Sequence, residues 1–478
     1  MAPDNHGVLR TSVRLHDVPN EILRLIFVRL HKEDLKSVRL VCKLWSILPL
    51  GLLFDRVYIS PHSINVQVFN NIAAHPHISR CITELIYDVC EFRVDLSRQD
   101  YFDALCHQLY KRCSHSRPLD LEFDTADEQL NEILQYAREK HGHVPGGIDW
   151  SEWSDWTLSD YRVVDRGHRT YLESARQQQE YHDGGELLVH LCFGLKKLPA
   201  LKTVVLGGTW GDSLTDRRFD HTKVSPIYNC GSPLARTWNP LFLEPSVIGR
   251  RAYGHVDFFT VIRALSLSQK KVSEFESTRW LNLYQNTFDT KALMSPSLLH
   301  HTVNALNKVE WLAFSHIASK SSIKDTKSID AFPTILRSMS ALKHLSLDMN
   351  KMSPLENNPY MLVGIFGSHH AWCHLVSLDL ASFAADEANL LDFLISQQAL
   401  RELTLRDGEL TCGNWASALE QFRLSLKLET LTLRPPLVQF GGLTIWAEDY
   451  WNHLSKQEKT ERFFRYGGKN PLRVDSQA

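Results

Sequence analysis

Residues 342–347, Leu342-Lys-His-Leu345-Ser-Leu347, carry the spacing L-x-x-L-x-L that decides the expected fold. Clear copies of the same spacing begin at Leu375, Leu400 and Leu428. Because successive side chains of a β-strand point to opposite faces, the leucines would face a core, and the residues between them would line the other face of a sheet. The repeated unit therefore predicts a series of similar strands.

The series extends toward the N-terminus in fainter copies. These begin at Ile82, Leu201, Val272 and Val309. The last five copies start at 309, 342, 375, 400 and 428, so they are 33, 33, 25 and 28 residues apart. Between them apolar residues recur at helical spacing, as in Ile335-Leu336, Leu390-Leu391 and Trp415–Phe422. This pattern predicts an α/β chain folded as an irregular leucine-rich-repeat-like solenoid, in which each unit covers its neighbour's apolar face.

A doubly wound α/β domain is the alternative fold, because it also alternates strands and helices. No glycine-rich phosphate-binding loop follows these strands in the sequence, which favours the solenoid. The asparagine or cysteine that usually follows the strand of a leucine-rich repeat is missing. The repeats are therefore irregular, and the sequence does not predict their curvature.

Two long inserts interrupt the series, near residues 140–185 and 207–255. Both are predicted to be loops between strands, because they are rich in glycine, proline and polar residues. Trp150, Trp153 and Trp156 would share one helix face in the first insert. Packing of these rings onto neighbouring helices is the simpler interpretation. Since tryptophan is enriched at binding hot spots, the inserts are also the first candidates for target contact.

The segment from Trp446 to Tyr466 has the pattern of one amphipathic helix. A repeat array needs its last apolar face closed, so residues 435–478 are predicted to form a C-terminal helical cap.

At the other end, residues 15–56 read LHDVPNEILRLIFVRLHKEDLKSVRLVCKLWSILPLGLLFDR. Pro19 can open a helix, since its missing N–H would be unpaired there anyway. A first apolar stripe runs from Ile22 to Leu30, and a second from Leu35 to Leu48 is expected to stop at Pro49 and Gly51. A helical cap on the repeats is one interpretation. So short a segment cannot bury all of this apolar surface by itself, so it must either dock on the rest of the chain or hold a partner, and the apolar pattern alone favours the cap.

The order of residue types in this stretch resembles the F-box motif from end to end, with Val18-Pro19 where the motif usually has Leu-Pro. The resemblance implies a three-helix element over residues 13–58 that docks the Skp adaptor of cullin-based ubiquitin ligases. Some signature residues would contact the adaptor, and others would hold the helices together. The positions that match the family's apolar signature are Val18, Pro19, Ile22, Leu23, Ile26, Val41, Cys42 and Trp45.

A weaker second resemblance, to uncharacterised fungal F-box proteins, involves Ile82–Asp88, the long inserts and Tyr466-Gly-Gly-Lys-Asn-Pro-Leu-Arg473. In this organisation residues 1–12 are a flexible N-terminus and residues 59–434 are the repeat domain. The resemblance implies a substrate-recognition subunit whose repeats hold an unidentified target protein. A scaffold that binds the Skp adaptor without a role in ubiquitin transfer has the same sequence features.

Composition gives no sign of other partners. The formal net charge is −2, so no single-sign field favours nucleic acid or a membrane. The nine cysteines form no CxxC pair, and Cys106, His107, Cys113 and His115 fit no zinc spacing. No GxSxG, HExxH or Walker-type motif occurs, so neither enzyme activity nor a cofactor or metal is predicted. Without a signal peptide or apolar span, we expect an intracellular protein of the cytoplasm or nucleus.

Overall fold

The computed structural model describes residues 18–88, 92–102, 104–105, 162–207, 254–277, 296–315, 331–348, 366, 370–439, 443–446 and 453–472. Within these ranges no helix combines the length and the apolar character needed to cross a membrane.

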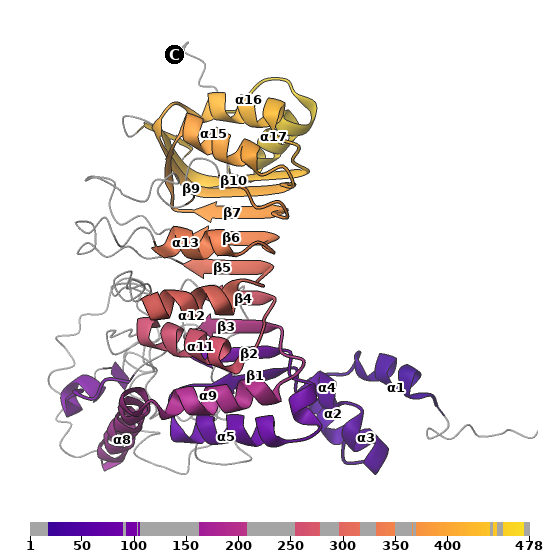
Figure 1. Cartoon of the computed structure of the whole chain (residues 1–478), viewed down its shortest axis with the longest axis vertical. Coiled ribbons are helices and arrows are strands. Elements are labelled where there is room, and N and C mark those ends of the chain that lie inside the picture. Colours follow the sequence, from indigo (N-terminus) through magenta and orange to yellow (C-terminus); the bar gives the residue numbers. More distant parts are fainter. Residues whose placement is uncertain are drawn as a thin grey trace, which may run out of the picture.

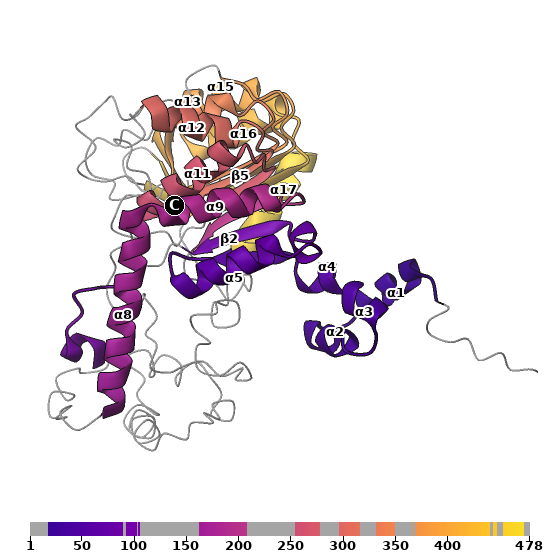
Figure 2. The same ribbon diagram turned by 60° about the horizontal axis from the view of Figure 1, so that its bottom comes forward.

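Four short helices open the described chain and project from one end of the structure (Figures 1 and 2). They are α1 (Asn20–Phe27), α2 (Lys32–Val38), α3 (Lys43–Ile47) and α4 (Leu50–Leu53). Pro19 is the N-cap of α1, and its carbonyl accepts from the N–H of Leu23 at 3.1 Å. Helix α3 ends at Ile47, just before Pro49 as predicted, but a further helix that contains Gly51 follows directly. Pro49 caps α4, since proline suits the start of a helix.

In the part of the chain that the structure describes, one eleven-stranded sheet forms the body, and its strands follow one another in sequence order (Figure 1). Nearly all neighbours are parallel; β10 and β11 are antiparallel, and β8 is a short branch on β9. The strands are β1 (Arg56–Ile59), β2 (Glu84–Asp88), β3 (Thr203–Gly207), β4 (Glu274–Ser277), β5 (Trp311–Ser315), β6 (His344–Asp348), β7 (Ser377–Ala381), β8 (Ala384–Asp386), β9 (Glu402–Cys412), β10 (Thr430–Gln439) and β11 (Leu443–Trp446).

Each of the eight predicted L-x-x-L-x-L copies contributes one strand, from β2 to β7 and then β9 and β10. The register aligns equivalent positions, so that Leu345 lies beside Leu312 and Leu378, and Leu347 lies beside Leu380. These leucines are buried. The predicted alternation is therefore confirmed for these strands. The sequence pattern did not reveal β1, β8 or β11.

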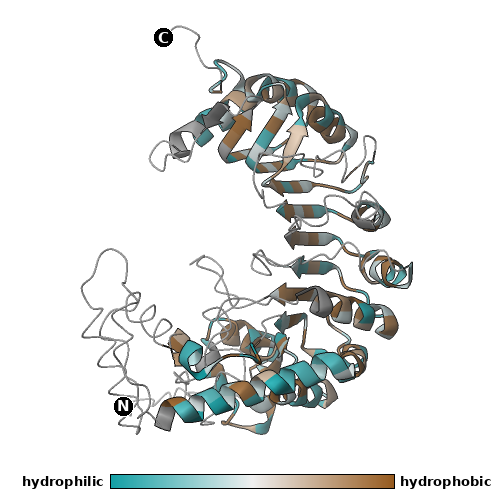
Figure 3. Ribbon diagram, turned by 90° about the vertical axis from the view of Figure 1, so that its left-hand side faces the viewer, coloured by the Kyte–Doolittle hydropathy of each residue, from teal (hydrophilic) through white to brown (hydrophobic). Residues whose placement is uncertain are grey.

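Helices cover one face of the sheet, and the sheet curves so that these helices lie on its outer side (Figure 3). Their apolar side chains and the inward strand residues form one continuous core. The helices of the body are α5 (Ser63–Ala74), the short 3-10 helix η2 (Ile78–Arg80), α9 (Glu186–Lys197), α11 (Gly254–Ser268), α12 (Pro296–Leu306), α13 (Ala331–Ser338), α15 (Glu387–Ser396), α16 (Trp415–Ser425) and α17 (His453–Tyr466).

The prediction of a loop near residues 140–185 is wrong for its described part. Residues Arg162–Gly184 form the helix α8, which projects from the sheet (Figure 2). Buried Val164, Tyr171 and Ala175 recur along it, and Gly185 ends it at a φ of 67°, a conformation that glycine adopts without strain. The remainder of that insert, with its three tryptophans, lies outside the described residues, as does most of 207–255.

The single helix predicted over Trp446–Tyr466 is also corrected. Trp446 ends β11, and helix α17 begins at His453. Phe463 and Phe464 of α17 join the main core together with Leu472 beyond it. Gln457 binds the edge of β10, donating to the Leu431 carbonyl and accepting from the Leu433 N–H. The C-terminal end of the sheet is thus covered by a helix and closed by an antiparallel strand.

Candidate functional site

The N-terminal helices have a small core of their own, separate from the core of the sheet. Leu23, Phe27 and Leu35 are almost fully buried in it. The ring of Trp45 meets Phe27 edge-on, with centroids 5.7 Å apart. The partly buried side chains around this core are Val18, Leu30, Val38, Trp45, Leu48, Leu52 and Leu53.

Much apolar surface remains outside this core. We call the following set the exposed apolar face: Ile22, Leu25, Ile26, Val28, Leu40, Val41, Leu44 and Ile47, each at least 40% exposed. These side chains come from α1, α3 and the turn between α2 and α3. So many exposed large apolar side chains on one small module are unusual for a soluble monomer, and such surfaces commonly mark interaction sites. The residue types and helical geometry suit docking into an apolar groove.

The structure divides the eight residues of the predicted adaptor site into three groups by exposure. Ile22, Ile26 and Val41 belong to the exposed apolar face, and Pro19 beside them is exposed. Leu23 is buried, so it holds the helices together and offers no surface to a partner. The remaining three, Val18, Cys42 and Trp45, are half-buried; Val18 and Trp45 pack against the small core, and Cys42 is the N-cap of α3.

Sequence reasoning missed five members of the exposed apolar face. They are Leu25, Val28, Leu40, Leu44 and Ile47. Leu25 and Val28 follow Ile22 at successive three-residue steps but were not counted in the apolar stripe, and a count of all apolar residues of α1 could have found them. Leu40 is the most exposed of all, because α2 ends at Val38 and the following turn directs it away from the core.

Helix α4 connects the small core to the core of the sheet. Leu52 and Leu53 pack on the small core, and the next residue, Phe54, packs on the main core. The guanidinium of Arg39 lies 5.6 Å from the centre of the Phe54 ring, and its Nε donates to the Ser46 carbonyl at 3.3 Å. On the other side, a methyl group at Gly51 would lie 3.7 Å from Cys81 Sγ. Burial raises the pKa of this thiol.

A second candidate surface is the face of β4–β7 opposite the helices. We call it the open sheet face and define it by Glu274, Glu276, Trp311, Ala313, His344, Ser346, Ser377 and Asp379. All of these side chains are at least partly exposed. Arg406 of β9 neutralises Asp379 through two hydrogen bonds, Nε to Oδ1 at 3.0 Å and Nη2 to Oδ2 at 2.9 Å.

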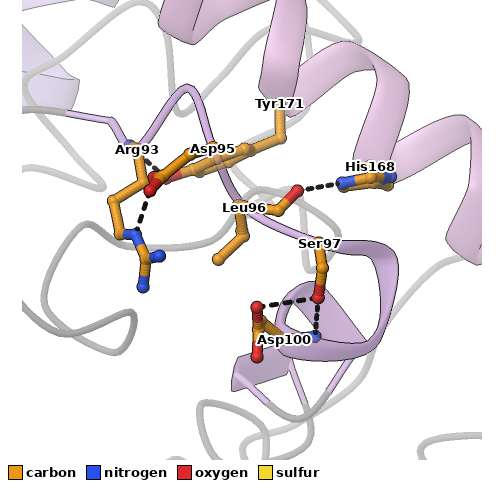
Figure 4. Close-up of polar contacts among 7 residues, drawn as sticks. All are labelled: Arg93, Asp95, Leu96, Ser97, Asp100, His168 and Tyr171. Atoms are coloured by element: carbon orange, nitrogen blue, oxygen red, sulfur yellow. Dashed lines mark hydrogen bonds and ion pairs between the residues drawn. The ribbon is translucent and has the colours of Figure 1, made fainter.

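The segment 92–102 packs against α8 through the contacts drawn in Figure 4. The Tyr171 hydroxyl accepts from the Arg93 N–H at 3.0 Å, and His168 Nε2 lies 2.8 Å from the Leu96 carbonyl. The rings of Phe92 and Tyr101 lie 5.4 and 5.9 Å from Tyr171. Burial, above all, raises the pKa of the Tyr171 phenol. These contacts are structural: they attach the segment to the projecting helix.

The described residues contain no group of three or more His, Cys, Asp or Glu side chains placed to hold a metal ion. The cysteine and histidine residues between 106 and 115 lie outside the described ranges.

Comparison with known proteins identifies the N-terminal module. Residues 15–60 match the F-box-like family. None of the curated proteins compared with the chain matches it. The matched range includes all four N-terminal helices and the whole exposed apolar face. The protein therefore has an F-box-like domain, and domains of this kind bind the Skp adaptor.

Proposed function

We propose that this protein is the target-recognition subunit of a Skp-cullin-F-box ubiquitin ligase. The F-box-like domain would dock the Skp adaptor, which in turn binds cullin, and the sheet domain would hold a target protein. The observation that carries the first half is the exposed apolar face, which lies within the range matched by the F-box-like family.

The sheet domain is, in this proposal, an irregular leucine-rich-repeat-like solenoid. Two observations support it. The strands lie in sequence order from β1 to β7, whereas a doubly wound sheet reverses its strand order at a switch point. Among the described residues, the helices of the body cover one face (Figure 3), and the outward positions of β4–β7 on the other face are at least partly exposed to a partner.

No bond would be made or broken on this chain. Its contribution to ubiquitin transfer would be proximity, since holding a target near the transfer machinery raises its effective concentration. The connection through α4 supports this role, because Leu53 of α4 packs on the small core and the next residue, Phe54, packs on the main core, which holds the docking domain close to the sheet. This role places the protein inside the cell, in the cytoplasm or nucleus.

The proposal is tested by co-purification of the full chain with the Skp adaptor. The informative variant is the double substitution Ile22→Asp and Ile26→Asp, because both side chains are 46% exposed and their loss leaves the small core intact. We expect adaptor binding to be lost. Leu424→Asp is the matched control, since Leu424 is an equally apolar, 69% exposed residue on α16. It should bind the adaptor like the wild type.

Retention of the adaptor by the Ile22 and Ile26 double variant would refute the docking assignment.

Adding cullin to the wild-type complex separates the ligase-subunit role from the scaffold role. A ligase subunit brings cullin into the complex, whereas a scaffold that binds the adaptor alone does not. Leu23 is unsuitable for this test, because an aspartate there would unfold the domain.

A further inference from the structure

Trp311 is the one aromatic side chain of the open sheet face besides His344, and it lies next to a carboxylate. Its register partner on the neighbouring strand is Glu274, and neighbouring strands are about 4.8 Å apart. The carboxylate of Glu274 is exposed, and its Oε2 accepts from the Thr203 hydroxyl at 2.9 Å. The hydrogen bond orients the carboxylate without neutralising its charge.

Small neighbours leave space around these two side chains. The residue two positions after Trp311 on the same face is Ala313, whose register partner on β6 is Ser346. Neither side chain extends far above the sheet. His344 lies on the side of Trp311 away from Glu274. Trp311 is partly exposed and Glu274 is exposed, so among the described residues nothing keeps an incoming side chain from reaching the ring and the carboxylate.

The charges nearby favour a cation. The outward positions of β4–β7 contain no lysine or arginine. Lys202 lies closest in the backbone, since its carbonyl accepts from the Glu274 N–H at 3.1 Å, but it precedes the outward position of Thr203 by one residue. Other described basic groups near the face are paired: Arg56 with Glu84 at 2.8 Å, Lys343 with Glu310 at 2.7 Å and Arg406 with Asp379. Glu276, which makes contacts of its own, adds a second carboxylate on β4. This part of the sheet is thus acidic around one aromatic ring.

We propose that Trp311 and Glu274 form a subsite for an arginine side chain of the target protein. A guanidinium stacks on an aromatic face, tryptophan most favourably, and its planar donors match a carboxylate. The inference rests on the proposed function, in that it assumes a target polypeptide on the sheet face. It adds the chemistry of recognition: a basic segment, read through an arginine.

The test uses the full chain in complex with the Skp adaptor and short degenerate peptides with a fixed central residue. Peptides with central arginine are compared, by fluorescence anisotropy, with peptides carrying citrulline, which has the same shape but no charge. We expect the arginine pool to bind roughly three to thirty times more tightly, the range given by a cation–π contact and an exposed ion pair. A lysine pool shows how much of the preference depends on the planar guanidinium.

Variants assign the preference to the subsite. Trp311→Ala and Glu274→Gln should each remove most of the discrimination, and Trp311→Phe should retain part of it. The control is Glu458→Gln, which removes one exposed carboxylate on α17, away from this face. It should leave the discrimination unchanged.

Equal affinity of the wild type for the arginine and citrulline pools, or absence of binding to both, overturns the proposal. So does a preference that survives Glu274→Gln. These results are independent of adaptor binding, which depends on Ile22 and Ile26. Loss of the arginine preference with intact adaptor binding refutes the subsite alone, and the reverse result refutes the docking assignment alone.

Discussion

Leu23 and Ile26 lie three residues apart on α1 but in opposite environments: Leu23 is 1% exposed in the small core, whereas Ile26 is 46% exposed. The family signature contains both, and the structure gives them different roles. Leu23 stabilises the domain, and Ile26 belongs to the surface through which we propose that the domain binds the Skp adaptor.

This difference predicts different effects of the same substitution. Leu23→Ala should lower the free energy of unfolding of the domain by about 2–5 kcal/mol, because it opens a cavity in a small core. Ile26→Ala should change it by less than about 0.5 kcal/mol. The rate of hydrogen exchange at the α1 amides, measured in the full chain, reports the change in stability for each of the two variants. Equal acceleration of exchange in the two variants would contradict the assignment.

The close approach of α9 to α5 depends on Gly194. A methyl group at this position would lie 2.1 Å from Cε1 of the buried Phe69, so one of the two helices must move. We expect Gly194→Ala to destabilise the protein by roughly 1–3 kcal/mol, the usual cost of overpacking. Thermal unfolding measures the change. Gly184→Ala is the control, since its new methyl group would make an ordinary contact at 3.8 Å and should not destabilise.

Because of His62, the free energy of unfolding should depend on pH and should decrease below neutrality. Its Nδ1 accepts from the Ile64 N–H at the start of α5, and burial lowers its pKa to about 4. The unfolded chain, with a histidine pKa near 6.5, binds the proton more readily between these two values. Stability should therefore fall as the pH drops from about 6.5 to about 4, by up to roughly 3 kcal/mol from this group.

His62→Asn tests this assignment, because asparagine keeps an N-cap acceptor but does not titrate in this range. Denaturant unfolding at several pH values should give a shallower decline for the variant than for the wild type. If the two curves remain parallel between pH 4 and 6.5, His62 is not the group responsible.

Tyr171→Phe should loosen the segment 92–102 from α8. The substitution keeps the ring contacts with Phe92 and Tyr101 but leaves the Arg93 N–H without its acceptor, at a cost of about 1 kcal/mol. Faster hydrogen exchange at residues 92–102 is the expected result. Tyr181→Phe, at the other end of the same helix, should leave that segment's exchange unchanged.

The positions of the strands followed from local sequence pattern. A copy such as Leu342–Leu347 needs few distant contacts to become a strand with one apolar face, and all eight copies did so. The short strands β1, β8 and β11 could not be found this way. Arg56–Ile59 lacks the repeat spacing, and its pairing with β2 forms only once the two segments meet. The helix α8 was missed because its polar composition hides the widely spaced buried residues.

The sequence by itself determined where the eight repeat strands lie and that the N-terminal stretch resembles an F-box, because these depend on residue order over short distances. The tertiary structure decided which signature residues are exposed, since burial depends on how α1, α3 and α4 pack. It also brought Trp311 beside Glu274, 37 residues earlier in the chain, through the register of β4 and β5. Neither arrangement is encoded locally, because each exists only when separate elements share one core.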